Sequence, residues 1–338
     1  PVPHEEGRSG LDYYLELGYV PVDRVTESVP KTLESAYDDW CIAQLAKELG
    51  KEKDYEMFMK RAGYYANVWD AETEFMRPKK HDGNWLEPLG DNQQEILTHK
   101  DHRYYKYFDP LLVGRRPNRH YTESNAWQYL WSVQHDVKGL ADLFGEKEAF
   151  VSKLDSFFSM SPEISPPKYV GVVGTIGQYV HGNQPSHHVA YLYSYLGQPW
   201  KTQERVSQVM QLYRTGPGGL CGNEDMGSLS SWYVFSALGF YPVCPGQNVY
   251  VIGTPLFERA TISVGNPDEP VEFIVEAGNL SEENRYIQSA SLNGEAMSKS
   301  WLSHEEIVRG GTLRFVMGPE PNPDWGSKAA DIPPSMTP

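Results

Sequence analysis

Apolar residues recur at helical spacing through the first two thirds of the chain. The stripe runs every three or four residues over 33–49, after Thr32 as a candidate N-cap, and Gly50 ends it. The same spacing returns over 54–69, so two helices joined by a glycine turn are predicted to form an αα-hairpin. Two more hairpins are predicted from 123–144 with 149–158 and from 187–196 with 200–213, and a further helix from 230–238.

After residue 245 the pattern changes to short β-branched or alternating runs. Strands are predicted at 248–252, 260–264, 271–276, 285–291 and 312–317, separated by turn residues such as Asn293-Gly294 and Gly310-Gly311. The predicted fold is therefore mainly α. Residues 1–245 form a partial (α/α)6 toroid of αα-hairpins that lacks its first helices, and residues 246–338 form a C-terminal antiparallel β unit with a Pro-rich tail.

Composition narrows the functional classes. The 338 residues carry a net charge of −15, which excludes binding to nucleic acid through phosphate neutralisation. No apolar run approaches the ~20 residues of a membrane span, and the first residues do not resemble a signal peptide. Three cysteines are too few for a disulfide scaffold but leave room for one bridge. Nine Trp residues among 13% aromatics fit either a sugar-binding surface or a packed core.

Polar and aromatic residues are concentrated between Tyr121 and Tyr129. Glu123 stands at the start of the predicted helix, one turn before Trp127. Two interpretations stay open: a catalytic carboxylate, or a first-turn glutamate that the helix dipole stabilises. Long aromatic loops at 70–121, 159–185 and 215–228 flank the predicted hairpins and are expected to be ordered.

A second polar segment, His181 to His188, precedes another helix. Asn183 and Gln184 offer the hard oxygen ligands that Ca²⁺ prefers. The adjacent pair His187 and His188 does not match a zinc motif, because neighbouring helical residues point about 100° apart. A capped, hydrogen-bonded helix entry is the alternative.

Two acidic residues, Glu224 and Asp225, lie between Gly222 and Gly227, just before an apolar helix. Flanking glycines expose such carboxylates, and a helix N-terminus stabilises their anionic form, as a general base requires. The alternative is a polar turn with an acidic cap. Glu123 and Asp225 would supply the two carboxylates of glycoside hydrolysis, but their separation stays open from the sequence.

Several long runs resemble the family 92 glycoside hydrolases. They are Lys31–Trp40, Glu123–Tyr129, Gly182–His188, Gly222–Asp225 and Ser231–Val243, joined in the β part by Ile252–Phe257 and Leu292–Gly294. The resemblance covers nearly the whole chain. It implies a calcium-dependent, inverting exo-α-mannosidase with an N-terminal β-sandwich domain followed by an (α/α)6 barrel.

Residue by residue, the resemblance implies that Glu123 is the general acid and Asp225 the general base, with Glu224 as the alternative base. Asn183 and Gln184 lie in the segment expected near the calcium ion. The mannose-binding residues implied are Trp40, Trp127 and His187.

Two departures from the family follow from the sequence. The resemblance implies that family members specific for α-1,2 linkages carry a His-Glu pair shortly before the Gly-Asn-Gln/Glu-Pro segment. Here Gly177-Gln178-Tyr179 stands nearby, so the linkage stays open. Family members are also about twice this long. We therefore expect a fragment whose partners are a mannose-containing glycan and the N-terminal part of the same protein, located outside the cytoplasm as a secreted or periplasmic enzyme.

Two other functions are compatible with parts of the sequence. A non-catalytic carbohydrate-binding relative, or an inactive fragment, would use the aromatic loops without the acid pair. A metal-dependent lyase would need a Tyr/His base pair, for which His120 and Tyr121 are the candidates.

Overall fold

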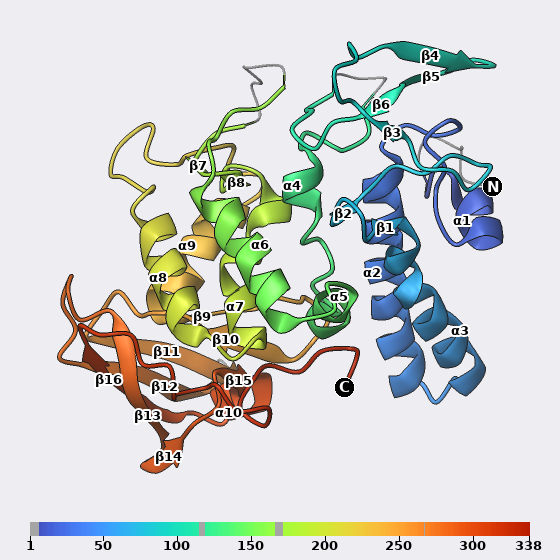
Figure 1. Ribbon diagram of the computed structural model, residues 1–338. Helices are drawn as coiled ribbons and strands as arrows, with labels where there is room; N and C mark the ends of the chain where they lie inside the picture. The colour runs from blue at the N-terminus through green and yellow to red at the C-terminus, as the bar shows by residue number, and fades with distance from the viewer. Residues whose placement is uncertain (1–6, 115–118, 166–171, 267) are drawn as a thin grey trace. The chain divides into compact units, whose positions relative to one another are not determined.

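The computed structural model describes residues 7–114, 119–165, 172–266 and 268–338. Contacts divide the chain into two compact units, Pro1–Val180 and His181–Pro338, which we call unit 1 and unit 2. Figure 1 shows helices in both units and a strand-rich part, coloured orange to red, near the end of the chain. Within the described ranges, no helix has both the length and the apolar character needed to cross a membrane.

Unit 1 contains the predicted first αα-hairpin. The helices are α1 (Leu11–Leu17), α2 (Ser28–Glu48), α3 (Glu52–Ala62), the 3-10 helix η1 (Gly63–Val68), α4 (Ala126–Tyr129), α5 (Val137–Leu143) and α6 (Lys147–Ser159). α2 and α3 pack against each other as an antiparallel pair. The predicted helix at 149–158 is confirmed as α6, whereas the segment predicted at 54–69 is completed by a 3-10 turn.

The single helix predicted for 123–144 is wrong, because the chain forms two short helices with an irregular stretch between them. α4 ends at Tyr129, and Asp136 begins α5 as an N-cap whose side chain accepts the Gly139 N–H at 3.1 Å. Tyr65 donates to the other Asp136 carboxylate oxygen at 2.9 Å. A long-range contact therefore fixes the second helix start, which periodicity cannot show.

The long loop at 70–121 is ordered where it is described, as predicted. It contains short pairs of strands: β1 (Trp69–Asp70) with β2 (Phe75–Met76), β3 (Glu87–Pro88) with β6 (Tyr107–Phe108), and β4 (Ile96–His99) with β5 (His102–Tyr105). The loop at 159–185 includes the pair β7 (Thr175–Ile176) and β8 (Tyr179–Val180). Residues 115–118 and 166–171 of these loops lie outside the described residues.

Unit 2 combines helices with the C-terminal strands. Its helical elements are the 3-10 helices η2 (Gln184–Ser186) and η3 (Val189–Tyr191), then α7 (Leu192–Tyr195), α8 (Pro199–Met210), α9 (Ser228–Leu238) and α10 (His304–Val308). The helices predicted at 200–213 and 230–238 are confirmed as α8 and α9. The one predicted at 187–196 is divided between η3 and α7.

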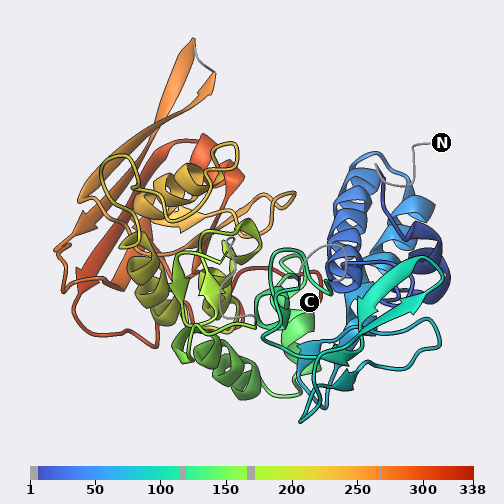
Figure 2. The same ribbon diagram turned by 90° about the horizontal axis from the view of Figure 1, so that it is seen from above.

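The strands of unit 2 form two sheets. The first has the order β15-β10-β9, from β9 (Phe240–Tyr241), β10 (Val249–Ile252) and β15 (Trp301–Ser303). The second has the order β11-β12-β16-β13-β14, from β11 (Arg259–Asn266), β12 (Glu269–Gly278), β13 (Tyr286–Leu292), β14 (Glu295–Met297) and β16 (Gly311–Gly318). The five predicted strands are confirmed, and Figure 2 shows β11 and β12 extending as a long ribbon.

The predicted purely antiparallel β unit needs correction, because β12 and β16 are parallel. After β12 the chain passes through β13, β14, β15 and α10, and β16 then inserts between β12 and β13. A parallel neighbour requires such a long crossover, whereas a tight turn gives only antiparallel pairs. The turns in the sequence indicate which consecutive strands are adjacent, but they do not indicate that β16 inserts between β12 and β13.

The core of unit 2 explains why its helices and strands group together. Buried side chains such as Phe273, Leu313 and Phe315 form one cluster, and Phe235 and Leu238 of α9 pack against it. The predicted division at residues 245 and 246 marks the change from helices to strands, and as a domain boundary it stays a prediction. The three cysteines, all within the described ranges, form no disulfide.

Candidate active site

Glu123 lies two residues before a capped helix start. Asn125 is the N-cap of α4, its side chain accepts the Gln128 N–H at 3.2 Å, and Gln128 completes the capping box. Glu123 is exposed and has a φ of 52°, in the left-handed region that non-glycine residues rarely adopt. It is therefore not a first-turn residue, and the helix-dipole interpretation of this glutamate does not apply.

The segment Gly177-Gln178-Tyr179 faces the interior of unit 1. The side chain of Gln178 is 1% exposed and that of Tyr179 is fully buried. Because neither side chain reaches the surface, a difference in linkage specificity at this position does not come from their direct contact with a sugar.

The segment 181–188 forms a buried, hydrogen-bonded entry to η2. His187 is 4% exposed, and its Nε2 donates to the carbonyl oxygen of His181 at 3.0 Å. Its own carbonyl oxygen accepts the indole N–H of Trp232 at 2.9 Å, which joins this segment to α9. Burial lowers the pKa of His187 to about 4, so the imidazole is neutral near neutral pH.

The turn 222–228 carries the two candidate acids in a strained conformation. Asp225, Met226 and Gly227 have successive φ values of 46°, 57° and 90°, and α9 begins at Ser228. Consecutive left-handed residues cost about 1–2 kcal/mol each for side chains other than glycine. Such strain persists only where surrounding contacts hold it, and it is concentrated at functional sites.

Glu224 and Asp225 have different surroundings. Glu224 Oε1 accepts the backbone N–H of Ser230 at 3.3 Å, in the first turn of α9. Its buried Oε2 has no hydrogen-bond partner among the described residues. Asp225 is exposed, and its Oδ2 accepts a hydrogen bond from Gln184 Nε2 at 2.5 Å. Glu224 therefore caps the helix, while Asp225 presents its carboxylate to solvent.

A close backbone contact joins the two predicted segments of unit 2. A Cβ built on Gly222 would lie 2.6 Å from the Cα of Gly182, so no side chain fits at this crossing. Together with the bond from Gln184 to Asp225, this contact brings the predicted calcium segment and the predicted base into one site. Glu123 lies in unit 1, so the predicted acid pair is divided between the two units.

The two predicted tryptophans differ in exposure. Trp40 is 5% exposed, and its ring stacks on Tyr37 at 6.2 Å and lies 6.2 Å from His135. Trp127 is half-buried, and its ring meets Phe75 edge-on at 5.0 Å. A sugar-stacking role requires an accessible ring, so the greater exposure of Trp127 suits this role better than the burial of Trp40; for both residues the role stays a prediction.

Lys153 is a neighbour of Trp127 that sequence reasoning missed. Its Nζ lies 4.8 Å from the Trp127 ring centroid and 4.0 Å from that of Phe75. Burial lowers the pKa of Lys153, while Glu74 pairs with it at 3.4 Å. This cation–π contact fixes the Trp127 ring, and the sequence spacing between residues 127 and 153 gives no indication of it.

The metal-dependent lyase alternative is excluded because both candidate base residues, His120 and Tyr121, are buried. His120 is buried and donates from Nε2 to the carbonyl oxygen of Tyr105 at 3.2 Å. Tyr121 is also buried, and its hydroxyl donates to the carbonyl oxygen of Met76 at 2.6 Å. Burial raises the pKa of Tyr121 and lowers that of His120 to about 4. Neither group can act as a base on a bound substrate.

The oxygens of the unit 2 site match the chemistry of a calcium ion. The residues that the structure describes contain no group of three or more His, Cys, Asp or Glu side chains suited to a metal. Calcium, however, also accepts amide and backbone oxygens. Gln184 uses its amide nitrogen on Asp225 and also carries an amide oxygen, and Glu224 Oε2 is a buried oxygen without a hydrogen-bond partner in the described part of the chain. Asn183, 9% exposed, adds an amide at the start of η2.

Comparison with known proteins gives one consistent result. The sequence model of the glycosyl hydrolase family 92 catalytic domain matches residues 1–319. A protein from Arthroderma benhamiae, named as a secreted glycosidase, is 32% identical over 98% of this chain and 42% of its own length.

Solved structures agree with the sequence match. The family GH92 α-mannosidase BT3965 from Bacteroides thetaiotaomicron has 40% identity and a TM-score of 0.82, over 96% of this chain and 39% of that one. The family GH92 inverting mannosidase BT2199 from the same organism has 40% identity and a TM-score of 0.81, over 98% of this chain and 43% of that one. This chain thus spans about two fifths of the length of these relatives.

Proposed function

Because this chain belongs to glycosyl hydrolase family 92, we propose that its protein hydrolyses terminal α-linked mannose from glycans with inversion at the anomeric carbon. The observation that carries the proposal is the 40% identity to an inverting mannosidase over 98% of the chain. A structure of BT3965 in complex with mannoimidazole, with a TM-score of 0.85, supports a mannose-like ligand.

Glu123 is the proposed general acid. Its exposed side chain would protonate the oxygen that leaves with the rest of the glycan. Asp225 is the proposed general base and would take a proton from the water that attacks the opposite face of the sugar. Inversion requires about 6.5–9.5 Å between the two carboxyl groups, to leave room for that water.

The surroundings of the acids favour Asp225 over Glu224 as the base. Asp225 is exposed and held by one amide donor from Gln184. Glu224 accepts from the first turn of α9 and has one buried oxygen, so attacking water reaches it less easily. A carboxylate that caps a helix has a structural role that a base does not need.

Gln184, Glu224 and Asn183 are the residues we propose to hold calcium. A bound calcium ion would supply a hard divalent charge for the sugar hydroxyls and would favour ring distortion toward an oxocarbenium-like shape. Of the chain's own residues, the half-buried Trp127, whose ring Lys153 fixes, would help to orient the sugar. Trp40 and His187 are the other two residues proposed for mannose binding, and both are buried.

The proposed organisation of the protein follows the architecture that the family resemblance implies. The pair α2 and α3 and the pair α5 and α6 would be hairpins of an (α/α)6 toroid, with the remaining helices and the β-sandwich supplied elsewhere in the protein. Residues 246–338 would be the C-terminal β unit. We propose a secreted or periplasmic location; the A. benhamiae relative, which is named as secreted, supports a place outside the cytoplasm.

Release of mannose from α-linked mannobioses tests the function. Proton NMR of the first product should show β-mannose, since the α-linkage is inverted. Comparing the α-1,2, α-1,3 and α-1,6 isomers would give the linkage preference. If no isomer is cleaved, or if α-mannose forms first, the proposal is wrong.

A further inference from the structure

The side-chain amide of Gln178 is hydrogen-bonded to the segment that carries Glu123 and to the loop after α6. Gln178 Nε2 donates to the carbonyl oxygens of Ser161 at 2.7 Å and Glu163 at 2.8 Å. Its Oε1 accepts from Asn125 Nδ2 at 3.0 Å. Both amide hydrogens and the amide oxygen are therefore engaged, in a side chain that is 1% exposed.

The hydrogen bonds continue to the residue next to Glu123. Gln128 Nε2 donates to the carbonyl oxygen of Gln178 at 3.3 Å. Gln128 Oε1 accepts from the Ser124 hydroxyl and from the Asn125 N–H. Because Ser124, Asn125 and Gln128 are all buried, water cannot replace these bonds when one is lost.

The turn that carries Gln178 is itself anchored to α6. Gly177 has a φ of 60°, and a Cβ there would lie 2.5 Å from the carbonyl oxygen of Phe157. The Gln178 N–H donates to that same oxygen at 2.8 Å. Gln178 thus links the end of a long helix to the segment 123–128.

We infer that Gln178 is a positioning residue for Glu123, an inference that rests on the proposed role of Glu123 as general acid. The left-handed backbone of Glu123 is unfavourable by itself and needs fixed neighbours. Gln178 supplies them through Asn125 and Gln128 and does not touch the sugar. A misplaced acid slows protonation of the leaving oxygen but leaves sugar binding intact.

The dependence of kcat on the leaving group of the substrate tests this role, measured in the full-length protein. Gln178→Met keeps the side-chain volume and removes the amide. We expect kcat for an α-mannoside with a poor leaving group to fall at least about tenfold, within the range of general acid catalysis. For a dinitrophenyl α-mannoside, which leaves without protonation, kcat should change less than about twofold, with KM unchanged on both substrates.

Two further variants keep the test decisive. Asn125→Asp keeps the oxygen that caps α4 but removes the donor to Gln178. It should show the same loss of kcat on the poor leaving group alone, and it replaces Gln178→Met if that variant does not fold. Gln203→Leu is the matched control: Gln203 is also 1% exposed, and its Oε1 accepts the Ile287 N–H at 3.0 Å in unit 2. Equal losses on both substrates, or the same pattern in the control, would overturn the inference. If Glu123→Gln itself shows no leaving-group dependence, the proposed acid is wrong instead.

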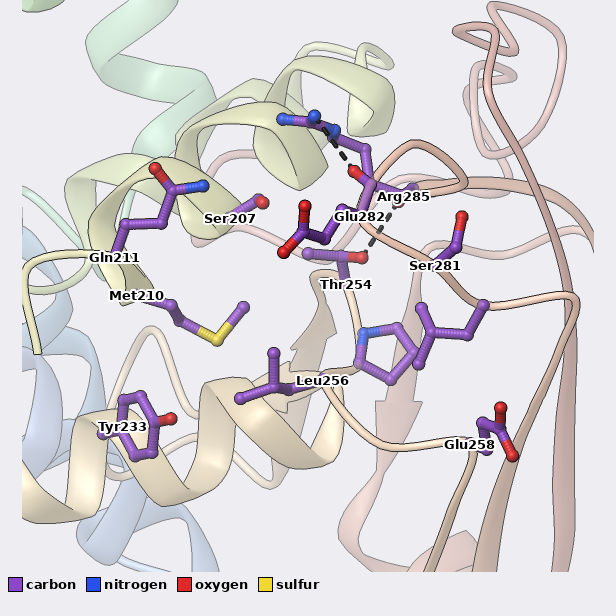
Figure 3. A pocket seen from close by; sticks show the side chains of 12 residues that line it. Ser207, Met210, Gln211, Tyr233, Thr254, Leu256, Glu258, Ser281, Glu282 and Arg285 are labelled. Carbon is purple, nitrogen blue, oxygen red and sulfur yellow. Dashed lines mark hydrogen bonds between the residues drawn. The ribbon is translucent and has the colours of Figure 1, made fainter. Parts of the chain in front are cut away.

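A separate observation is a pocket of about 560 Å³ in unit 2. Figure 3 shows Gln211 and Tyr233 on its helical side and Glu258 and Ser281 on its loop side. None of the predicted site residues lines it. Its volume lies in the usual range for a bound small molecule, about 300–1,000 Å³.

The pocket is held in shape by its own hydrogen bonds. The Thr254 hydroxyl donates to the carbonyl oxygen of Arg285 at 2.9 Å, and Arg285 Nη2 donates to that of Glu282 at 3.0 Å. The Tyr233 ring packs on Tyr213 with 4.7 Å between centroids. A preformed pocket binds with little ordering cost.

The lining chemistry leads us to propose that this pocket binds a neutral saccharide away from the active site. Met210 and Pro255 add apolar surface to its lining, while Gln211, Glu282 and Arg285 offer planar hydrogen-bonding groups. The carboxylates of Glu258 and Glu282 outnumber the single guanidinium of Arg285, and the chain has a net charge of −15. Binding of an anion in this pocket is therefore disfavoured. A pyranose has both an apolar face and adjacent hydroxyls, which match this lining.

Calorimetry with α-1,2-, α-1,3- and α-1,6-mannobiose tests the pocket, using the Asp225→Asn variant so that the sugar is not consumed. Gln211→Ala with Glu282→Ala should weaken one class of binding at least about tenfold, whereas Glu283→Ala, an exposed neighbour outside the pocket, should not. Turnover in the wild-type background should not change. A single class of saccharide site, unaffected by the double substitution, would overturn the proposal without affecting the proposed hydrolysis.

Discussion

Gln184 donates a hydrogen bond from Nε2 to Asp225 Oδ2 at 2.5 Å, which joins two segments separated by 41 residues. The donor lies in η2 and the acceptor in a left-handed turn before α9. The bond fixes the position of the carboxylate that we propose as the general base.

Gln184→Glu would replace the amide donor beside Asp225 by a second carboxylate, which repels a negative charge on the first. The acidic limb of the kcat/KM profile should then move to higher pH by about one unit. Asn223→Asp adds the same charge in the exposed part of the turn and is the control. An unchanged limb in Gln184→Glu would contradict the assignment of Asp225 as base.

Glu123→Gln and Asp225→Asn should each lower kcat by about 10²–10⁴-fold while the melting temperature stays close to that of the wild type. Both side chains are exposed, so their loss does not open the core. Glu224→Gln keeps an oxygen for the Ser230 N–H and should retain more activity than Asp225→Asn. The opposite order would show that Glu224 is the base.

Calcium should stabilise the protein if Gln184 and Glu224 hold it. We expect a chelator to lower the melting temperature by several degrees, about 3 °C or more, and added calcium to restore it. Glu224→Ala should remove most of this calcium-dependent shift, because it deletes the buried oxygen that has no partner among the described residues. Scanning calorimetry measures the shift without any activity assay, and equal shifts in both proteins would contradict the ligand assignment.

Gly222→Ala should destabilise the protein by about 1–3 kcal/mol, since the new methyl group would lie 2.6 Å from the Cα of Gly182. Gly63→Ala is the matched control, because nothing lies within 4 Å of a Cβ at that position. Urea unfolding of both variants gives the difference. A Gly222→Ala protein as stable as the control would show that the two segments separate easily.

Acid should weaken the fold around His181 and His187, whose rings lie 4.8 Å apart. Burial lowers the pKa of His181 to about 2 and that of His187 to about 4, whereas both approach 6.5 on unfolding. Between pH 6.5 and 4 the unfolded chain binds more protons, so the free energy of unfolding falls as the pH decreases. For His187 the loss reaches about 3 kcal/mol.

Urea unfolding between pH 7 and pH 4.5 measures this effect. His187→Asn should be less stable than the wild type at pH 7 and should lose less stability on acidification. His304→Gln, at an exposed position, should keep the full slope. A wild-type protein with flat stability across this range would contradict the neutral, buried state of both imidazoles.

Elements whose cause is local can be predicted from the order of the amino acids alone. The apolar stripes of α2, α6, α8 and α9 and the alternation of β11 and β12 depend on neighbouring residues, so periodicity found them. The family motifs likewise placed Glu123, Asp225 and Gln184 in short runs that can be read without a fold. Hydrophobic period and motif spacing act over a few residues, within the reach of sequence reasoning.

Features that depend on distant partners can be seen only in the folded chain. Tyr65 sets the start of α5 through Asp136, and β16 enters the sheet beside β12 after a long crossover. Trp40 is a buried residue because His135 and Tyr37 cover it. Glu224 and Asp225 look equivalent in the chain, yet one caps a helix and the other accepts from Gln184. Burial and hydrogen bonding are properties of the folded neighbourhood, so adjacent residues with the same chemistry acquire different roles.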